Sequence, residues 1–177
     1  MRKPGVLPVE IETEVPFHDV DLARIAWHGH HLKYLENARW ALMDSVGHGL
    51  DVMLAANEGW PIIDLRVSYL RAARYRDRLR VRASFRAWEG ALTINYLITD
   101  ARTGERVARA QTRQVAVDMA TGQMHFALPA EFIASLEAAL ARATDLTPAA
   151  APTRTPATAP TPAVSASPEA KPGGAAR

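Results

Sequence analysis

Cysteine is absent from this chain of 177 residues. Without thiols the chain cannot form a disulfide scaffold, a thiolate nucleophile, a zinc knuckle or an iron–sulfur site. It also lacks a run of about 18 apolar residues, which a membrane-spanning helix would need. The first 14 residues carry two basic side chains but no apolar stretch of the kind found in a secretory signal. We therefore expect a cytoplasmic protein that does not contact a membrane.

An excess of charge of one sign is missing as well, because the formal net charge is only +2. Arginines nevertheless alternate along two segments, at positions 78, 80, 82 and 86 and at positions 109 and 113. Aromatic residues that could stack on bases are not interleaved with them, which argues against nucleic-acid binding. The simplest interpretation is a solvated outer sheet face. The alternative is attraction of an anionic ligand or of an acidic partner protein.

Composition divides the chain at Thr144. Segment 144–177 consists largely of Ala, Pro and Thr, holds seven of the twelve prolines and contains no aromatic residue. Such a segment buries too little apolar surface to offset the entropy of ordering it. The sequence therefore predicts one folded domain over residues 1–143 and a disordered tail over 144–177.

Hydrophobic periodicity predicts an α+β fold for the domain. Period-two alternation indicates a strand over 10–17, helical spacing indicates a long helix over 31–46, and Gly47 is expected to end that helix. After a short helix at 51–57, four strand-like segments follow, at 62–72, 77–88, 92–98 and 107–117, and a final helix is expected over 129–142. The segment 62–72 places Ile63, Leu65, Val67 and Tyr69 on one face. An antiparallel sheet that wraps one long helix is the simplest arrangement.

The segment 17–31 joins the first strand to the long helix and carries most of the candidate chemistry. Its polar groups lie beside a helix N-terminus, where unpaired amides and the helix dipole favour negative charge. Such a place can polarise a carbonyl, and Asp19 or Asp21 could act as a general base or a nucleophile. Asp21 could equally be a turn or cap residue, and Asp19 is interpreted as structural.

This segment resembles the hotdog-fold acyl-CoA thioesterases, in particular the 4-hydroxybenzoyl-CoA thioesterase group. The likeness lies in Asp-x-Asp, an apolar pair, an aromatic residue with His, and Leu-Lys-Tyr-Leu-Glu-x-Ala-Arg, which together span Asp19–Arg39. It implies a hotdog fold, a long central helix wrapped by a curved antiparallel sheet of about five strands. The implied activity is hydrolysis of acyl-CoA or acyl-carrier-protein thioesters, without a metal or other cofactor.

The resemblance also implies roles for single residues. Asp21 matches the catalytic carboxylate, and His28 matches the position whose backbone N–H binds the thioester oxygen. Glu36 matches a supporting glutamate in the helix. Arg24 departs from the family, which has glycine there, and this raises the question of whether the loop is rebuilt. Hotdog domains pair edge to edge, so a homodimer or homotetramer is implied.

Further residues are predicted to bind substrate. Arg71 and Arg74 are the first candidates for phosphate contact. Trp27, Trp60, Pro61 and Ile62 are predicted to line the acyl pocket, with ordinary core packing as an equal alternative for the tryptophans.

Three other functions remain open at this point. Arg24 motivates a non-hydrolytic acyl-binding protein on the same fold. A dehydratase acting on 3-hydroxyacyl thioesters would use a His with an acidic partner. The cluster of His28, His30 and His31, with Asp21 and Glu36, could also be a metal site, although the spacing alone supports it weakly.

Overall fold

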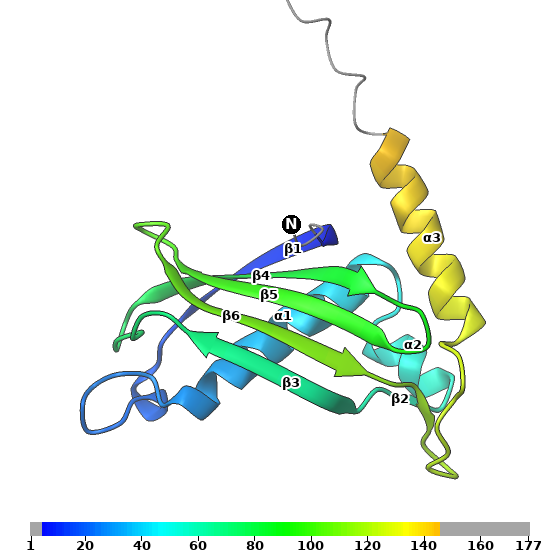
Figure 1. The fold of residues 1–177 in the computed structure, drawn as a ribbon, viewed down its shortest axis with the longest axis horizontal. Coiled ribbons are helices and arrows are strands. Elements are labelled where there is room, and N and C mark those ends of the chain that lie inside the picture. The colour runs from blue at the N-terminus through cyan, green and yellow to red at the C-terminus, as the bar shows by residue number, and fades with distance from the viewer. Residues whose placement is uncertain (1–4, 146–177) are drawn as a thin grey trace, which may run out of the picture. The chain divides into compact units, whose positions relative to one another are not determined.

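The computed structural model describes residues 5–145. Five antiparallel strands form its main sheet, in the order β1-β4-β5-β6-β3 (Figure 1). Their bounds are Val6–Glu14 for β1, Ile62–Tyr69 for β3, Arg78–Ala87 for β4, Leu92–Asp100 for β5 and Arg106–Gln114 for β6. This order leaves β1 and β3 as the two edges of the sheet.

The long helix α1, His31–Ser45, lies against one face of this sheet. Ala38, Leu42 and Met43 of α1 are fully buried and belong to the same core as residues of the central strands. Burying a Leu or Met side chain stabilises a fold by about 1.5–3 kcal/mol, so this contact is a major source of stability. The predicted α+β hotdog architecture is confirmed.

Gly47 ends α1 as the sequence predicts. Its φ of 76° is in the left-handed region that favours glycine. The Gly47 amide donates to the Asp44 carbonyl at 2.9 Å, and the His48 amide donates to the Met43 carbonyl at 3.0 Å. These two bonds satisfy carbonyls that the end of the helix would otherwise leave unpaired.

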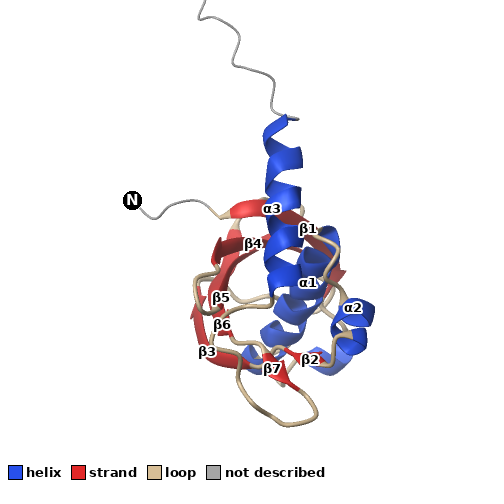
Figure 2. Cartoon of the chain, turned by 90° about the vertical axis from the view of Figure 1, so that its right-hand side faces the viewer, coloured by secondary structure: helices blue, strands red, loops and turns tan. Residues whose placement is uncertain are grey.

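The remaining elements close the far end of the core. They are α2 at Leu50–Ala55, the short pair β2 at Glu58–Gly59 and β7 at Val117–Asp118, and α3 at Ala130–Asp145 (Figure 2). Phe132 of α3 is fully buried and packs edge to face against Trp60 and His48, with ring centroids 5.0 and 5.2 Å apart. None of the helices within 5–145 is long and apolar enough to cross a membrane.

The first strand differs from its predicted range. It spans Val6–Glu14 rather than 10–17, because Pro16 opens a 3-10 turn at Phe17–Asp19 that bends the chain towards α1. The last helix continues to Asp145, two residues beyond the predicted domain boundary. The rest of the predicted tail, 146–177, lies outside the described residues.

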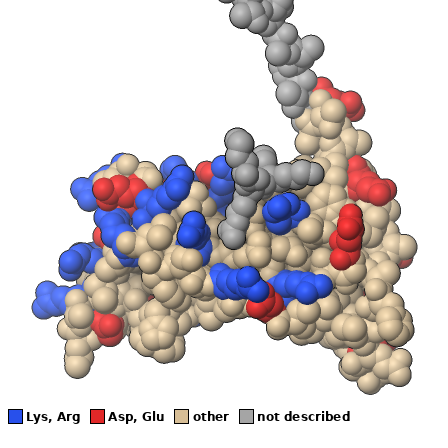
Figure 3. All heavy atoms as spheres, in the orientation of Figure 1, with Lys and Arg blue, Asp and Glu red and all other residues tan. Residues whose placement is uncertain are grey.

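Basic side chains gather over the outer face of the sheet (Figure 3). Arg80 is bonded to Glu12 at 2.8 Å, and both Arg80 and Arg82 approach Glu10. Part of this basic face is therefore neutralised by acidic residues of β1, as expected of a solvated outer surface.

Candidate active site

The loop between β1 and α1 is bonded to the segment that follows β3. Ala26 donates its amide to the Ala73 carbonyl at 2.8 Å, and an isolated bridge joins Ile25 to Arg74. A second bridge joins Val20 to Ala26 within the loop itself. The loop therefore has a defined conformation that is set against the connection after β3.

Asp19 is the buried anchor of this loop, with 1% of its surface exposed. Its carboxylate accepts hydrogen bonds from Lys33 and from the Tyr34 hydroxyl, the latter at 2.7 Å. Burial alone would raise the pKa of Asp19, but these bonds and the charges of Lys33 and His30 lower it below its usual value. Both carboxylate oxygens are thus engaged in holding the loop to α1, which agrees with the structural role interpreted from the sequence.

Asp21 occupies a tight turn two residues further on. Its Oδ1 accepts the amides of Ala23 at 2.8 Å and Ile25 at 3.4 Å. Its Oδ2 makes no hydrogen bond to any residue of 5–145 and is therefore available to another molecule. One carboxylate oxygen of Asp21 therefore caps the turn, while the other stays free.

The backbone conformation at Arg24 is of interest because this residue stands where the family has glycine. Its φ is 58°, so an arginine adopts the left-handed conformation that glycine would take most easily. The Arg24 amide donates to the Asp21 carbonyl at 2.9 Å, and the Arg24 carbonyl accepts from the Tyr75 amide at 3.3 Å. Arg24 therefore takes a left-handed conformation within a hydrogen-bonded turn.

His28 begins the 3-10 turn His28–His30 that leads directly into α1. The preceding amide, of Trp27, donates to the Asp19 carbonyl at 2.9 Å, but the His28 amide has no acceptor within residues 5–145. The His28 carbonyl accepts from the Tyr69 hydroxyl at 2.9 Å. A free amide at the start of a helix, in a residue whose carbonyl is held by a hydrogen bond, is suited to bind a carbonyl oxygen.

Asp21 and His28 line one cavity of about 370 Å³, which we call the Asp21 cavity. Its walls are Asp21, Ile25, Ala26, Trp27, His28, His31, Tyr69, Leu70, Arg71 and Ala72. Trp27 and Arg71 were predicted to bind substrate, and the structure brings them together with the two candidate catalytic residues.

The other predicted substrate-binding residues lie elsewhere. Trp60 is buried against Phe132 at the far end of the core, and Pro61 does not line the Asp21 cavity. Arg74 does not line it either, and its amide donates to Asp77 at 2.8 Å. For Trp60 this placement favours the core-packing alternative.

Two acidic side chains balance the positive charge of Arg71, which lines the cavity. Its guanidinium binds Asp100 at 2.7 Å and Glu105 at 3.1 Å. The hydrogen bond to Asp100 and the two nearby carboxylates raise the pKa of Arg71. The predicted phosphate contact would have to compete with two acidic side chains, so this geometry gives it little support.

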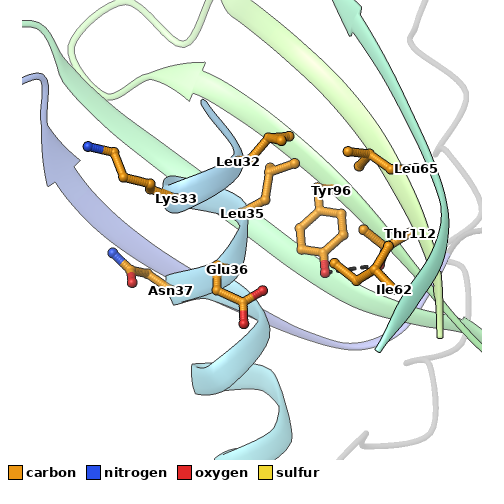
Figure 4. Close-up of a pocket in the computed structure, with 9 residues that line it drawn as sticks. All are labelled: Leu32, Lys33, Leu35, Glu36, Asn37, Ile62, Leu65, Tyr96 and Thr112. Atoms are coloured by element: carbon orange, nitrogen blue, oxygen red, sulfur yellow. Dashed lines mark hydrogen bonds between the residues drawn. The ribbon is translucent and has the colours of Figure 1, made fainter. Parts of the chain in front are cut away.

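Ile62 lines a second hollow, between α1 and β3, which we call the β3 groove (Figure 4). It has a volume of about 540 Å³. Leu32 and Leu35 of α1 face Leu65 of β3 across it, with Tyr96 between them. Because its walls are largely apolar, the groove can accept a hydrocarbon group.

A buried chain of polar side chains runs beside this groove, and sequence reasoning missed it. Arg39 donates to Glu36 at 2.9 Å and to Gln114 at 2.8 Å, and Gln114 donates to Thr112 at 3.1 Å. Thr112 in turn bonds the Tyr96 hydroxyl at 3.2 Å. The available signal was Thr112 and Gln114 at alternate positions of one strand, together with the Glu36-x-x-Arg39 spacing on the helix.

The three histidines do not converge as metal ligands. His30 approaches Asp19 at 3.7 Å, the His31 ring lies against Tyr69, and Glu36 is paired with Arg39. Among residues 5–145, no three His, Asp or Glu side chains are grouped so that they could hold a metal ion.

Comparisons with known proteins assign the family. The model of the thioesterase-like superfamily matches residues 15–163, most of the chain, and the chain belongs to this superfamily. A Synechocystis protein provisionally named an esterase, sll0410, is 27% identical over 121 residues, which cover 68% of this chain and 73% of that protein.

Solved structures share the fold. A 1,4-dihydroxy-2-naphthoyl-CoA thioesterase from Synechocystis superposes with a TM-score of 0.65 at 20% identity, covering 76% of this chain and 96% of that one. The DHNA-CoA thioesterase of Staphylococcus aureus gives a TM-score of 0.68 at 18% identity, covering 78% and 92%. At these identities the likeness shows the hotdog fold alone.

Proposed function

We propose that this protein hydrolyses acyl thioesters, of coenzyme A or of an acyl carrier protein, in the Asp21 cavity. One observation carries the proposal: a carboxylate with a free oxygen and an amide without an acceptor line the same cavity at the start of α1. Membership of the thioesterase-like superfamily supports the reaction type. The proposal includes a cytoplasmic location.

The chemistry follows from these two groups. The thioester oxygen accepts the His28 N–H, which polarises the carbonyl. Asp21 Oδ2 removes a proton from water as the water oxygen bonds to the carbonyl carbon. The tetrahedral intermediate then collapses, the C–S bond breaks, and the thiolate takes up the proton to leave as a thiol. Direct attack by Asp21 to give a mixed anhydride, which water then hydrolyses, uses the same geometry.

The acyl chain would extend from the Asp21 cavity into the β3 groove. Leu32 lines that groove and directly follows His31, which lines the Asp21 cavity, so the two hollows adjoin along α1. The groove is open along the exposed edge strand β3, and a second copy paired on this edge would close it. We therefore propose a homodimer as the minimal active form, with a homotetramer as a further assembly.

Replacement of Asp21 by Asn tests the proposal directly. The substitution keeps the size of the side chain but removes the base, so release of thiol from acyl-CoA should fall by about 10²–10⁴-fold. Thiol release is followed with a chromogenic disulfide, and circular dichroism checks that the fold is intact. Asp51→Asn, on the exposed first turn of α2, is the matched control and should retain wild-type turnover. Full activity of Asp21→Asn would refute the proposal.

The role assigned to His28 belongs to its backbone, which allows a second test of the same mechanism. His28→Pro removes the N–H at a helix start, where proline is tolerated, and should reduce turnover by about 10²–10³-fold. His28→Ala keeps the N–H and should reduce turnover much less. Equal losses in the two variants would show that the amide does not bind the carbonyl.

A further inference from the structure

Buried polar atoms without hydrogen-bond partners occur in two residues that line the Asp21 cavity. Within residues 5–145, three buried side-chain nitrogens have no hydrogen-bond partner: Nδ1 and Nε2 of His31, and Nε of Arg71. Both residues line the Asp21 cavity. Folded proteins pair nearly all of their buried polar groups, so exceptions that share one cavity indicate hydrogen bonds reserved for a ligand.

His31 supplies a neutral imidazole. Only 3% of its surface is exposed, and its ring lies edge-on to Tyr69 with centroids 5.2 Å apart. Burial lowers the pKa of His31 more than the nearby backbone groups of Trp27 and His28 raise it, and this favours the uncharged ring. A neutral imidazole offers one N–H donor and one nitrogen acceptor. This pair of functions matches a hydroxyl group, which also donates once and accepts.

The charges around the cavity favour a neutral ligand group over an anion. Arg71 carries one positive charge, but Asp100 and Glu105 both bind its guanidinium. Asp21 adds a further carboxylate to the wall. A second carboxylate or a phosphate would be repelled here, whereas an uncharged oxygen can accept the Arg71 Nε–H without that penalty.

The position of His31 indicates where on the acyl group this oxygen would lie. His31 is three residues after His28, about one turn of helix. Tyr69 connects the two residues, because its ring packs on His31 while its hydroxyl bonds the His28 carbonyl. The unpaired nitrogens are therefore near the position proposed for the thioester carbonyl. A hydroxyl one or two carbons away from that carbonyl would reach them.

We propose that His31 and Arg71 form a hydroxyl-binding subsite that makes this protein selective for thioesters of 2- or 3-hydroxyacyl groups. The inference rests on the proposed thioester hydrolysis and names its substrate class. The hydroxyl donates to one imidazole nitrogen or accepts from it, and it also accepts from Arg71 Nε. The acyl group without a hydroxyl would leave these buried nitrogens unpaired, which is the physical basis of discrimination.

Matched substrates provide the test. We expect kcat/KM for 3-hydroxybutyryl-CoA over butyryl-CoA, or for lactoyl-CoA over propionyl-CoA, to favour the hydroxylated member of at least one pair by about tenfold or more. His31→Phe keeps a ring in place but removes both nitrogens, so this ratio should fall towards one. His31→Gln retains a donor and an acceptor and should preserve part of the ratio. His125→Phe, at an exposed histidine outside the cavity, is the matched control and should leave the ratio unchanged.

Arg71→Lys examines the second member of the subsite. Lysine keeps a positive charge beside Asp100 but lacks the Nε–H, so the ratio should fall by a smaller factor than in His31→Phe. A wild-type ratio of one in both pairs would overturn the inference, as would a ratio that His31→Phe leaves unchanged. An equal loss on both members of a pair would overturn it too, because it would place His31 in a step common to all substrates.

Binding separates this inference from the proposed function. Ketone analogues, in which a methylene group lies between the carbonyl carbon and the sulfur, bind but cannot be hydrolysed. Calorimetry should show tighter binding of the hydroxylated analogue even if Asp21→Asn proves fully active and the proposed mechanism fails. Equal affinity for both analogues, with Asp21→Asn inactive, would remove the inference and leave the hydrolase.

Discussion

The two edges of the sheet differ in the side chains they present. Along β1, Glu10, Glu12 and Glu14 alternate with inward residues and stand opposite Arg82, Arg80 and Arg78 of β4. Along β3, large apolar residues are exposed instead: Ile62 is 43% exposed, Ile63 54%, Leu65 38% and Tyr69 46%. Charged side chains protect an edge strand from pairing, whereas an exposed apolar edge is a template for another strand.

This difference indicates which edge would pair in the proposed homodimer. The apolar face of β3 points towards α1, yet α1 leaves it open, and the β3 groove lies between them. In a monomer this face would expose a contiguous apolar surface, which soluble proteins rarely maintain without a function. β3 also contributes Tyr69 to the Asp21 cavity. The edge that we propose to pair is therefore also an edge of the proposed site.

Ile63→Lys should produce the largest effect. A lysine on β3, the strand proposed to pair, brings a charge from each subunit into an apolar β3–β3 interface, so the dimer should dissociate. Turnover should fall by more than about tenfold, because the groove would lose its second wall. Sedimentation equilibrium and the thiol-release assay measure the two effects.

Glu12→Lys is the matched control for this prediction. It introduces the same side chain on the opposite edge and should change neither assembly nor turnover. If Ile63→Lys remained dimeric, the protein would associate through another surface. Dissociation caused by Glu12→Lys would assign the interface to β1.

The comparison also shows what the sequence could predict. Periodicity located α1 and every strand of the main sheet, and Gly47 marked the end of the helix, because each of these signals lies within a few neighbouring residues. The sheet order was not predictable in the same way. Strand β3 pairs with β6 rather than with its neighbour in sequence, β4, and this order places β3 at the edge opposite β1.

In the candidate site, too, the residues that could be predicted are those that lie close together in the sequence. Asp21 and His28 were found because one short motif contains both. Tyr69 and Arg71 lie more than 40 residues further along the chain, and the sequence did not reveal that the Tyr69 hydroxyl bonds the His28 carbonyl. Trp60 shows the opposite case: aromatic composition suggested a pocket residue, but packing against Phe132 placed it in the core.

Tyr69→Phe tests whether β3 contributes to the site itself. The change removes the hydrogen bond to the His28 carbonyl but keeps the ring against His31. A single hydrogen bond of this kind contributes about 0.5–1.5 kcal/mol, so kcat should fall by about 2- to 10-fold without loss of the dimer. Burial raises the pKa of Tyr69, so the hydroxyl remains a donor across the usual assay range.

Tyr75→Phe is the matched control, because the Tyr75 hydroxyl makes no hydrogen bond within the described residues and its ring packs on Phe17 and beneath the Arg76 guanidinium. It should retain wild-type kcat. Equal kcat values for the Tyr69 and Tyr75 variants would show that β3 closes the groove but does not position the His28 amide.

The smallest effect is expected from Glu12→Gln on β1. Glu12 accepts from Arg80 at 2.8 Å, and both side chains are about half exposed. Solvent and salt screen such a pair, so the melting temperature should fall by no more than about 2 °C at low ionic strength, and the difference should vanish in high salt. Assembly and turnover should be unchanged, because no residue of β1 lines either hollow. A loss of turnover in this variant would mean that the charged edge also supports the site, and the contrast between the two edges would no longer hold.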